Sequence, residues 1–427
     1  MKKLVLLLVL IVCAGIAYYI YVDTKPPHID LGIAEKAQIN HPLTIKISDD
    51  RALNKVCYTL SGGNCSGAER CQSNIRSDSF ALQVEPDTCL PNNEPLDITV
   101  SVKAVDASLI PNQTEATATF TYDTQPPNVI TLGGTRYLKR GGSGVVLYEV
   151  GEPPAATGIV LDDLKFRAFP YDQNRFLSFY AHPYFIKADD FKPRIFAEDA
   201  AGNQRKVRPG SATASRSFKS EKIVLTDAFL DIVKDKMMAT AASSPLEAFL
   251  YVNDTMRQEN YRTIVEACSD TQPEQLWEGA FLRNQGATKA GFADSRTYVY
   301  GSEAVSQQVH TGIDIAGINN SEIVASNHGR VVFTGEIGIY GNVVIIDHGY
   351  GIHSLYGHLS QITVNVGDRV QKGDPIAISG ETGLVFGDHL HFEIRVNGFP
   401  VNPIEWFDGD WIKSHIEPTM AKVRSIN

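Results

Sequence analysis

The feature that most constrains the fold is the stretch GDHLHFEIRVNG, which runs from Gly387 to Gly398. Polar and apolar side chains alternate along it, and the polar ones are His389, His391, Glu393 and Arg395. A period of two residues is that of a β-strand with one polar and one apolar face. We therefore predict a strand that presents both histidines on one face. Two merely exposed histidines are the simpler alternative, and the rest of the sequence has to decide.

The C-terminal part of the chain, 287–427, repeats this β pattern. Glycines bound short apolar runs such as GRVVFTG, GNVVIIDHGYG and GDRVQKGDPIAISG. Eight of the 11 histidines lie between His310 and His415, which is the strongest compositional signal in the chain. We predict a β-rich domain over 287–427 that uses histidine chemistry.

An internal repeat organises the N-terminal half. DTKPPHIDLG begins at Asp23, and DTQPPNVITLG begins at Asp123. Each copy continues with short alternating runs and turn residues, a spacing typical of an immunoglobulin-like β-sandwich. We predict two such modules, 23–122 and 123–215. Neither gathers candidate catalytic residues, so a spacer or docking role is the interpretation.

A helical segment is predicted between the modules and the C-terminal domain, within 216–286. It runs from Thr226 to about Cys268. Ser244, Pro245 and Glu247 match a helix N-terminus, with a capping serine, a proline at the first position and a glutamate three residues on. We interpret this region as a packing or linking element, with Cys268 as a buried free thiol.

The N-terminus, residues 1–22, predicts membrane targeting. Lys2 and Lys3 precede an apolar run, Leu4–Tyr21, which as a helix would span about 27 Å, close to one hydrocarbon core. The lysines favour a cytoplasmic N-terminus and an exported body. We favour an uncleaved anchor, and a cleaved signal peptide is the alternative.

Cysteine usage agrees with export. Cys57, Cys65, Cys71 and Cys89 lie close together, which predicts two disulfides in an oxidising compartment with the pairing left open. A zinc site would need tighter CxxC-like pairs, which this stretch lacks. The net charge of −10 argues against a nucleic-acid-binding protein, which would show a basic face.

The segment VHTGIDIAG carries one half of a metal site. His310 and Asp314 are an even number of residues apart, so an extended chain places both on one face, with Gly312 between them leaving room for an ion. The residues predicted on the opposite face are Val309, Thr311, Ile313 and Ile315. One histidine of HLH would complete three protein ligands for zinc, with the fourth position left for water.

The segment GIHSLYGHLS supplies a further histidine. His358 is predicted to share a strand face with Tyr356 and Ser354, while His353, at an odd offset, is predicted to point away. His328 and His348 follow turn patterns, so we interpret them as turn or surface residues.

Together, HxxxD, a later YxHL and a final HxH among glycine-bounded strands resemble the LytM/lysostaphin-type zinc metallopeptidases, over about Val309 to Trp406. The resemblance implies zinc ligands at His310, Asp314 and His391, one Zn²⁺ per chain, and catalytic histidines at His358 and His389. The stretch GFADSRTYVY is similar, more loosely, to membrane-anchored members from Gram-negative bacteria.

The family resemblance implies a function. Members cut peptide cross-links of bacterial peptidoglycan, with a zinc-activated water as nucleophile and histidines as proton carriers. We therefore expect a peptidoglycan endopeptidase whose partners are peptide stems, anchored in the inner membrane with its body in the periplasm. Which histidine is the base stays open, and Glu393 is a candidate for supporting a ligand.

Two other classes of function are alternatives. Some LytM-like domains lack the zinc ligands and instead bind and activate cell-wall amidases. An adhesion or scaffold protein, with the β-modules as its working part, is the other. Because all five motif positions are filled here, the sequence favours the enzyme.

Overall fold

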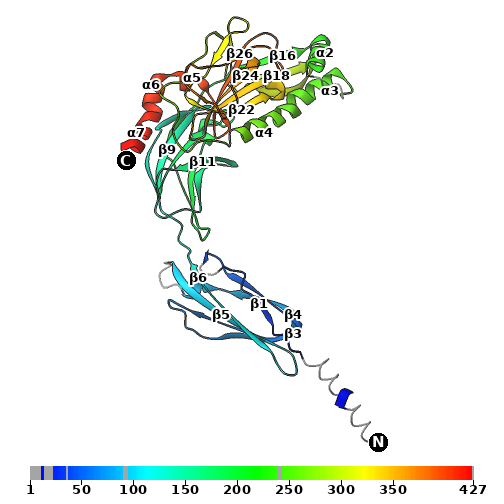
Figure 1. The fold of residues 1–427 in the computed structure, drawn as a ribbon, viewed down its shortest axis with the longest axis vertical. Helices are drawn as coiled ribbons and strands as arrows, with labels where there is room; N and C mark the ends of the chain where they lie inside the picture. The colour runs from blue at the N-terminus through cyan, green and yellow to red at the C-terminus, as the bar shows by residue number, and fades with distance from the viewer. Residues whose placement is uncertain (1–10, 14–22, 35–36, 90–94, 238–241, 426–427) are drawn as a thin grey trace. The chain divides into compact units, whose positions relative to one another are not determined.

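The computed structural model describes residues 11–13, 23–34, 37–89, 95–237 and 242–425, and these are mainly β, as predicted (Figure 1). They form two compact units: one reaches Pro127 and includes 198–205, and the other comprises 128–197 with residues from Lys206 onward. The predicted anchor lies outside the described residues apart from 11–13. Among the residues described, no helix is both long and apolar enough to cross a membrane.

The first unit is built on one sheet with the order β1-β3-β5-β6-β2, and β4 pairs with β3. Its strands are β1 (His28–Asp30), β2 (Gln38–Ile39), β3 (Leu43–Ser61), β4 (Arg70–Val84), β5 (Leu96–Asp106) and β6 (Gln113–Tyr122). Leu43, Ile45 and Ile47 alternate with exposed residues at the start of β3, and this apolar face forms the unit's own core. A short 3-10 turn, η1 (Pro86–Cys89), follows β4.

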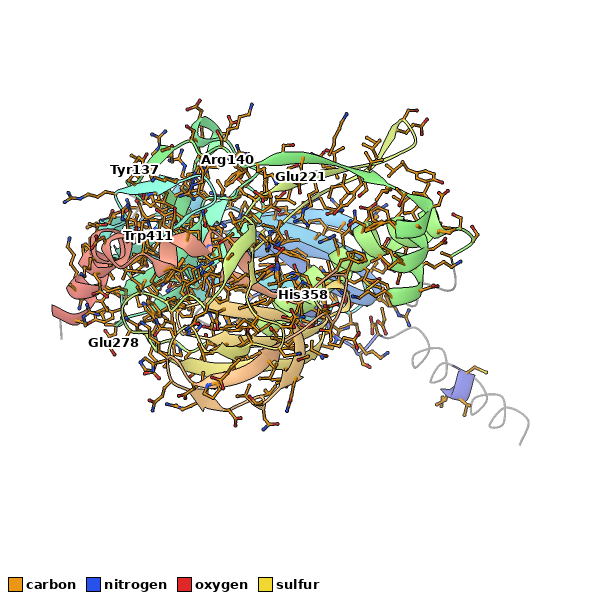
Figure 2. The ribbon with its side chains drawn as sticks, turned by 90° about the horizontal axis from the view of Figure 1, so that it is seen from above. Tyr137, Arg140, Glu221, Glu278, His358 and Trp411 are labelled. Carbon is orange, nitrogen blue, oxygen red and sulfur yellow. A yellow bond between two sulfur atoms is a disulfide. The ribbon has the colours of Figure 1, made fainter. Side chains whose placement is uncertain are left out.

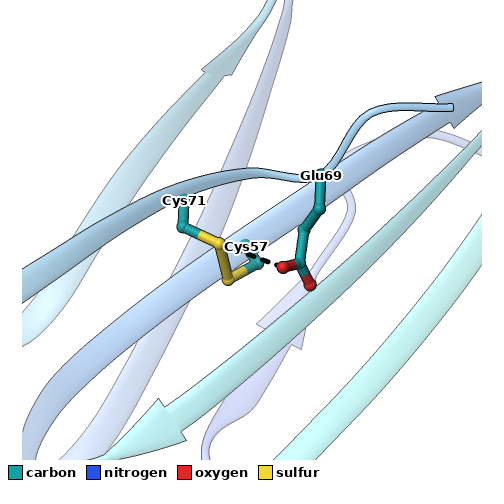
Figure 3. Close-up of side chains that lie close together, drawn as sticks. All are labelled: Cys57, Glu69 and Cys71. Atoms are coloured by element: carbon teal, nitrogen blue, oxygen red, sulfur yellow. Dashed lines mark hydrogen bonds between the residues drawn. A yellow bond between two sulfur atoms is a disulfide. The ribbon is translucent and has the colours of Figure 1, made fainter. Parts of the chain in front are cut away.

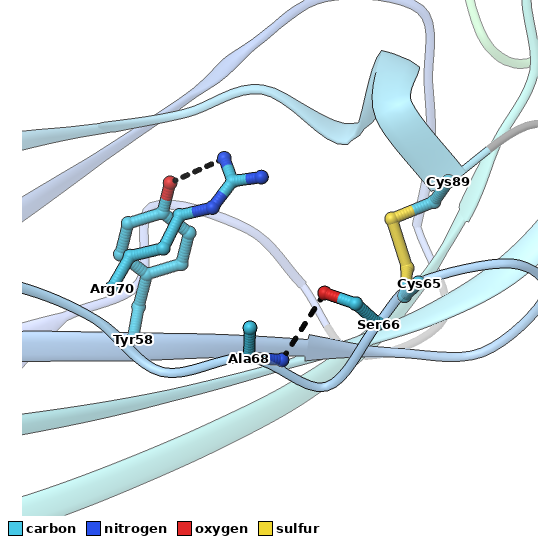
Figure 4. Close-up of a disulfide and its surroundings, with 6 residues drawn as sticks. All are labelled: Tyr58, Cys65, Ser66, Ala68, Arg70 and Cys89. Atoms are coloured by element: carbon cyan, nitrogen blue, oxygen red, sulfur yellow. Dashed lines mark hydrogen bonds between the residues drawn. A yellow bond between two sulfur atoms is a disulfide. The ribbon is translucent and has the colours of Figure 1, made fainter.

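Two disulfides close this unit, which confirms the prediction. Cys57 on β3 lies opposite Cys71 on β4, and the two are bonded (Figure 3). Cys65, in the loop between those strands, is bonded to Cys89 of η1 (Figure 4). The second bond ties the β3–β4 connection to the segment that leads towards β5.

The second unit begins with a seven-stranded sheet of order β14-β13-β10-β11-β12-β9-β7. Its strands are β7 (Val129–Gly134), β9 (Ser143–Val150), β10 (Ala156–Leu161), β11 (Leu164–Pro170), β12 (Arg175–Ala181), β13 (Arg194–Glu198) and β14 (Gln204–Val207). Its core continues into the C-terminal domain: the Phe179 ring lies 5.6 Å from Trp277 and 6.4 Å from Trp406.

The predicted helical region is confirmed. Thr226 caps α2 (Asp227–Lys236), and Ser244 caps α3 (Pro245–Leu250) by accepting a hydrogen bond from the Glu247 N–H. α3 continues through a π-helical turn, η3 (Tyr251–Met256), into α4 (Arg257–Ala267). Cys268 follows as a buried free thiol, as expected. Phe249 packs on Tyr298 with ring centroids 5.2 Å apart, so these helices are part of the second unit's core.

The second unit contains two smaller sheets. β8 (Tyr137–Lys139) pairs in parallel with β15 (Ala212–Ala214). β18 (Ser295–Tyr300) lies between β16 (Ser220–Leu225) and β19 (Glu303–Val309). β19 leads directly to His310, so this sheet borders the predicted metal site.

The C-terminal domain is a ten-stranded sheet. Its main path is β17 (Ala287–Ala290), β20 (Ile313–Ala316), β27 (Leu390–Val396), β24 (Ile352–Ile362), β23 (Asn342–Asp347), β22 (Gly329–Glu336) and β25 (Arg369–Val370), joined by β21 (Glu322–Val324), β26 (Pro375–Ser379) and β28 (Phe399–Val401).

Four short helical segments end the described chain: α5 (Pro403–Phe407), α6 (Gly409–Trp411), η5 (Ile412–Ile416) and α7 (Glu417–Ser425). They fold back on the seven-stranded sheet. Trp406 Nε1 donates to Ser143 Oγ at 3.1 Å, and Thr135 Oγ1 donates to the His415 carbonyl at 2.8 Å. Residues 403–425 thus connect the seven-stranded sheet to the ten-stranded one.

Candidate active site

The opening stretch forms β27, as its alternation predicts, and its polar face is buried rather than solvated. His391, Glu393 and Arg395 are all at most 4% exposed. Asp314 of β20 lies directly opposite His391 in the antiparallel register, so their side chains leave the sheet on the same face. Buried polar groups of this kind need partners. His391 has one in Asp314, and Arg395 donates to Glu393 and to the Gly398 carbonyl.

Three predicted ligands converge on one point. His310 Nε2, Asp314 Oδ1 and His391 Nδ1 lie 3.0 Å from one another in all three pairs. Donors at the corners of a tetrahedron with metal–ligand distances of about 2.0–2.1 Å would be about 3.3 Å apart. The three atoms therefore fit a single zinc ion, and no rearrangement of strands is needed.

The other nitrogen of each ligand histidine is held by the protein. His310 Nδ1 lies 2.8 Å from the Gly291 carbonyl, to which it donates, and His391 Nε2 lies 2.9 Å from Glu393 Oε1. Metal-bound histidines usually donate their second N–H in this way, which fixes the ring and its tautomer. This pattern is independent support for a metal at the point where the three donors meet.

Glu393 occupies the supporting position expected of it. Its carboxylate also accepts hydrogen bonds from Thr311 Oγ1 at 2.6 Å and Arg395 Nε at 2.5 Å. Burial alone would raise the pKa of Glu393, but the Arg395 charge and the His391 hydrogen bond outweigh it and lower the pKa. Burial would lower the pKa of His391, but Asp314 and Glu393 raise it to about 9.

Two expectations about the HTGID segment were wrong. Thr311 does not face away from the site, because its hydroxyl bonds Glu393. Gly312 leaves room for protein rather than for an ion: a Cβ there would lie 2.4 Å from the Phe392 carbonyl oxygen and 2.9 Å from His391 Cε1. The regular alternation begins only at Ile313, where β20 starts, with Ile313 and Ile315 buried and Asp314 on the other face.

The structure brings His358 to the site by a route that the sequence did not predict. Its ring centroid lies 5.0 Å from that of His389 and 5.7 Å from that of His391 (His358 is labelled in Figure 2). The Tyr356 ring instead contacts Phe392, whose side chain is on the other face of β27. The prediction that His358 and Tyr356 share a face was therefore wrong.

The physical reason is a β-bulge. His358 has φ of 64°, in the left-handed region, and the β23–β24 register shifts between the pairs Asn342–Leu359 and Val344–Tyr356. One extra residue on a strand re-aims the side chains beyond it, and such bulges are frequent next to active sites. His358 Nδ1 donates to the Thr382 carbonyl at 2.9 Å, which leaves Nε2 as the acceptor nitrogen.

His389 lies immediately before β27 and forms an isolated β-bridge with Gly380. Its Nδ1 donates to the Gly387 carbonyl at 2.8 Å, and its Nε2 is 3.7 Å from Asp314 Oδ1. His389 is thus beside the three converging donors without being one of them. Burial, followed by the charges of His391 and His389, lowers the pKa of His358 well below its ordinary value.

The remaining histidines of the domain lie elsewhere. His348 is a buried turn residue whose Nδ1 donates to the His328 carbonyl at 2.7 Å. His353 is paired across the strands with Arg395, so it lies on the same sheet face as His391, contrary to expectation, but its Nε2 contacts the Asp270 carbonyl. It is therefore no partner of His358, as the sequence reasoning concluded.

A cavity of about 240 Å³ opens above the converging donors. The five predicted residues line it, and so do Arg257 of α4, Arg296 and Tyr298 of β18, and the loop residues Leu384–Phe386. A groove of about 450 Å³ adjoins it and shares Arg257 and Tyr340 with it. The sequence analysis assigned these wall residues no role, because local spacing does not indicate which segments pack beside the predicted metal site.

Comparison with known proteins agrees with this geometry. The model of peptidase family M23 matches residues 308–403. The DD-carboxypeptidase/endopeptidase Mpg of Neisseria meningitidis serogroup B is 44% identical over 97 residues, which are 23% of this chain and 22% of that protein. The murein hydrolase activator EnvC of Escherichia coli (strain K12) is 37% identical over 107 residues, 25% of this chain and 26% of that protein.

The matches to these curated relatives thus span about a quarter of their length. A solved peptidase M23 structure from Pseudomonas aeruginosa covers 63% of this chain and 94% of its own, with 18% identity and a TM-score of 0.41. The five histidine and aspartate positions described above all lie within the matched segment. This chain therefore carries a peptidase family M23 domain of the LytM/lysostaphin type.

Proposed function

We propose that this protein is a zinc-dependent endopeptidase that hydrolyses peptide cross-links of bacterial peptidoglycan. The observation that carries the proposal is the mutual 3.0 Å spacing of His310 Nε2, Asp314 Oδ1 and His391 Nδ1 at the floor of a cavity. The name of the Mpg relative, a DD-carboxypeptidase/endopeptidase, supports the reaction class.

The metal would supply Lewis-acid chemistry, by lowering the pKa of water and polarising a carbonyl group. The chain itself supplies the proton carriers. Thr382 and Gly387 carbonyls hold Nδ1 of His358 and His389, so Nε2 of each ring is left to take the proton of the attacking water and return one to the leaving amine. Arg395 and Glu393 hold the His391 ring in its ligand orientation.

We further propose that the body of the protein works outside the cytoplasm, in the periplasm, with residues 1–22 as an inner-membrane anchor. The disulfides Cys57–Cys71 and Cys65–Cys89 support an oxidising compartment. Thiol labelling of the protein in intact cells, before and after reduction, tests this proposal. Labelling of all four cysteines without reduction would contradict it.

The test of the activity is cleavage of purified peptidoglycan, with mass spectrometry of the products and elemental analysis of zinc. His391→Ala and Asp314→Ala should lose both zinc and cleavage. His389→Ala and His358→Ala should keep one zinc per chain and lose cleavage by about 10²–10⁴-fold, the usual contribution of acid–base assistance. Full activity of Asp314→Ala would overturn the ligand set.

A non-catalytic regulator is the competing function, because EnvC is named a murein hydrolase activator. The complete donor set favours the enzyme. The same purified protein, mixed with a cell-wall amidase, decides between them. Stimulation of the amidase by a chain that binds no zinc and cuts no cross-link would establish the regulator instead.

A further inference from the structure

The walls of the catalytic cavity carry an excess of positive charge that the zinc chemistry does not require. Among its lining residues, all of which the structure describes, Asp314 is the only carboxylate, and it belongs to the donor set. Arg257 and Arg296 line the same cavity and come from α4 and β18, outside the segment that matches the M23 family. The match to the M23 family therefore does not account for these two arginines in the cavity wall.

Arg257 is held in place by one end of its guanidinium group. Its Nε donates to Asn253 Oδ1 at 3.0 Å, and Asn253 is fully buried and donates in turn to Ser306 Oγ at 2.9 Å. Within the described part of the chain, the two terminal nitrogens of Arg257 have no hydrogen-bond or ion-pair partner. A fixed guanidinium with free terminal donors is suited to bind a carboxylate in a bidentate manner.

Arg296 is placed by an ion pair with Glu221. Its Nε lies 3.3 Å from Glu221 Oε1, while the other oxygen of Glu221 is bonded by Lys219 at 2.7 Å. The glutamate is thus shared between two cations, so it offsets the charge of Arg296 only in part. No partner is described for the terminal nitrogens of Arg296 either.

We propose that Arg257 and Arg296 form a carboxylate-binding subsite that makes the enzyme select peptides bearing a free carboxylate beside the scissile bond. This inference rests on the proposed endopeptidase function and names its substrate class. Arg257 also lines the adjoining groove, together with Tyr184, Tyr261 and Arg262, so it stands where the cavity continues into that groove. A carboxylate bound there would orient the peptide between the groove and His389.

The experiment uses a synthetic peptide dimer containing one cross-link, and the same dimer with its free carboxylates converted to carboxamides. The full-length protein should cut the acid form with a KM about 10–100-fold lower than that of the amide form, the range expected for hydrogen bonds to a charged group. Arg257→Gln and Arg296→Gln should each raise KM for the acid form, leave kcat within about 3-fold, and narrow or abolish the difference between the two dimers.

Arg136→Gln is the matched control, because Arg136 is an exposed arginine that lines neither the cavity nor the groove. It should leave both KM values unchanged. The zinc content and thermal unfolding midpoint of each variant distinguish loss of the subsite from loss of the fold. Arg257→Lys should retain part of the preference for the acid form that Arg257→Gln loses. Equal KM values for the two dimers with the unmodified protein would overturn the inference.

The failure of this inference and that of the proposed function are distinguishable. If the unmodified protein cuts neither dimer, the endopeptidase proposal fails. Fluorescence anisotropy of the two labelled dimers then tests the carboxylate-binding subsite by itself. The subsite is supported if the acid form binds more tightly than the amide form and Arg257→Gln removes this difference. Equal binding of the two forms contradicts it.

Discussion

The two copies of the internal repeat begin alike and are stabilised differently. In the first copy, Asn112 Nδ2 donates to the Asp106 carboxylate and to the Asp23 carbonyl. In the second, Asn203 Nδ2 donates to the Asp199 carboxylate and to the Asp123 carbonyl. Each copy therefore uses a matching asparagine to tie its opening aspartate to a buried aspartate at the end of a strand.

The two copies differ in what covers their apolar faces. The first has its own core and two disulfides. The second, 123–215, contains no cysteine, and its core is continuous with that of the C-terminal domain. A β-module that buries its apolar face against a neighbouring domain can therefore be stable without disulfides, whereas a module with a small core of its own is stabilised by them.

Removing a side chain from the shared core should give the largest effect. Trp406→Ala deletes a fully buried ring that contacts Phe179 of the second copy and Trp277, and should destabilise the second unit by about 3–5 kcal/mol. Calorimetry should show a lower unfolding transition for that unit, with the first unit's transition unchanged.

Phe120→Ala is the matching substitution in the first unit, because Phe120 is fully buried in that unit's own core. It should lower only the unfolding temperature of the first unit. If either variant lowered the unfolding temperatures of both units equally, the two cores would unfold together and would not be independent.

Removal of a cross-link should rank next. Cys65→Ser with Cys89→Ser opens a bond between residues 24 positions apart. A loop of that size contributes about 3 kcal/mol by restricting the unfolded chain. Urea unfolding of the double variant should show that loss in the first unit alone. If the unfolding free energy of the first unit did not change, its own hydrophobic core would be sufficient for its stability without this disulfide.

Acid should destabilise the second unit, by about 2 kcal/mol for each of two buried histidines. Burial lowers the pKa of His348 to about 3 and that of His182 to about 4, and both belong to the second unit. Between those values and about 6.5, the unfolded chain binds protons that the folded chain does not, so stability falls as the pH falls. For His348, lowering the pH from 7 to 5 should cost about 2 kcal/mol.

The measurement is the unfolding free energy of the second unit at several pH values, for the unmodified protein and for His348→Asn. The variant should show a shallower acid slope. In the first unit the described histidines, His28 and His41, are exposed. Equal acid slopes in His348→Asn and the unmodified protein would contradict the assignment.

The smallest effect should be the same in both copies. Asp106→Asn and Asp199→Asn keep the shape of the buried side chain and remove its charge. Each weakens the bond from the matching asparagine and should cost the first unit about 1 kcal/mol, because Asp199 lies in the segment 198–205 that belongs to that unit. Thermal unfolding of the two variants compares them directly. A much larger loss at Asp106 would show that the aspartate has a task in the first copy that it lacks in the second.

Features that depend on neighbours in the chain were readable from the sequence. The alternation of β27, the Ser244 cap of α3 and the clustered cysteines each follow from local spacing, and the structure confirms them. The choice of His310, Asp314 and His391 also came from the sequence, through the family resemblance. Periodicity, capping and residue type are local properties, so a short window contains the information needed.

How these segments pack against one another could not be inferred from local sequence. The bulge that turns His358 towards His389 depends on the register between β23 and β24, which no single strand encodes. Arg257 and Arg296 reach the cavity because α4 and β18 pack beside it, and the second copy of the repeat shares a core with α5 because the chain's end folds back. Local spacing specifies which face a side chain takes, but the partner of that face is set by packing between segments that are remote in sequence.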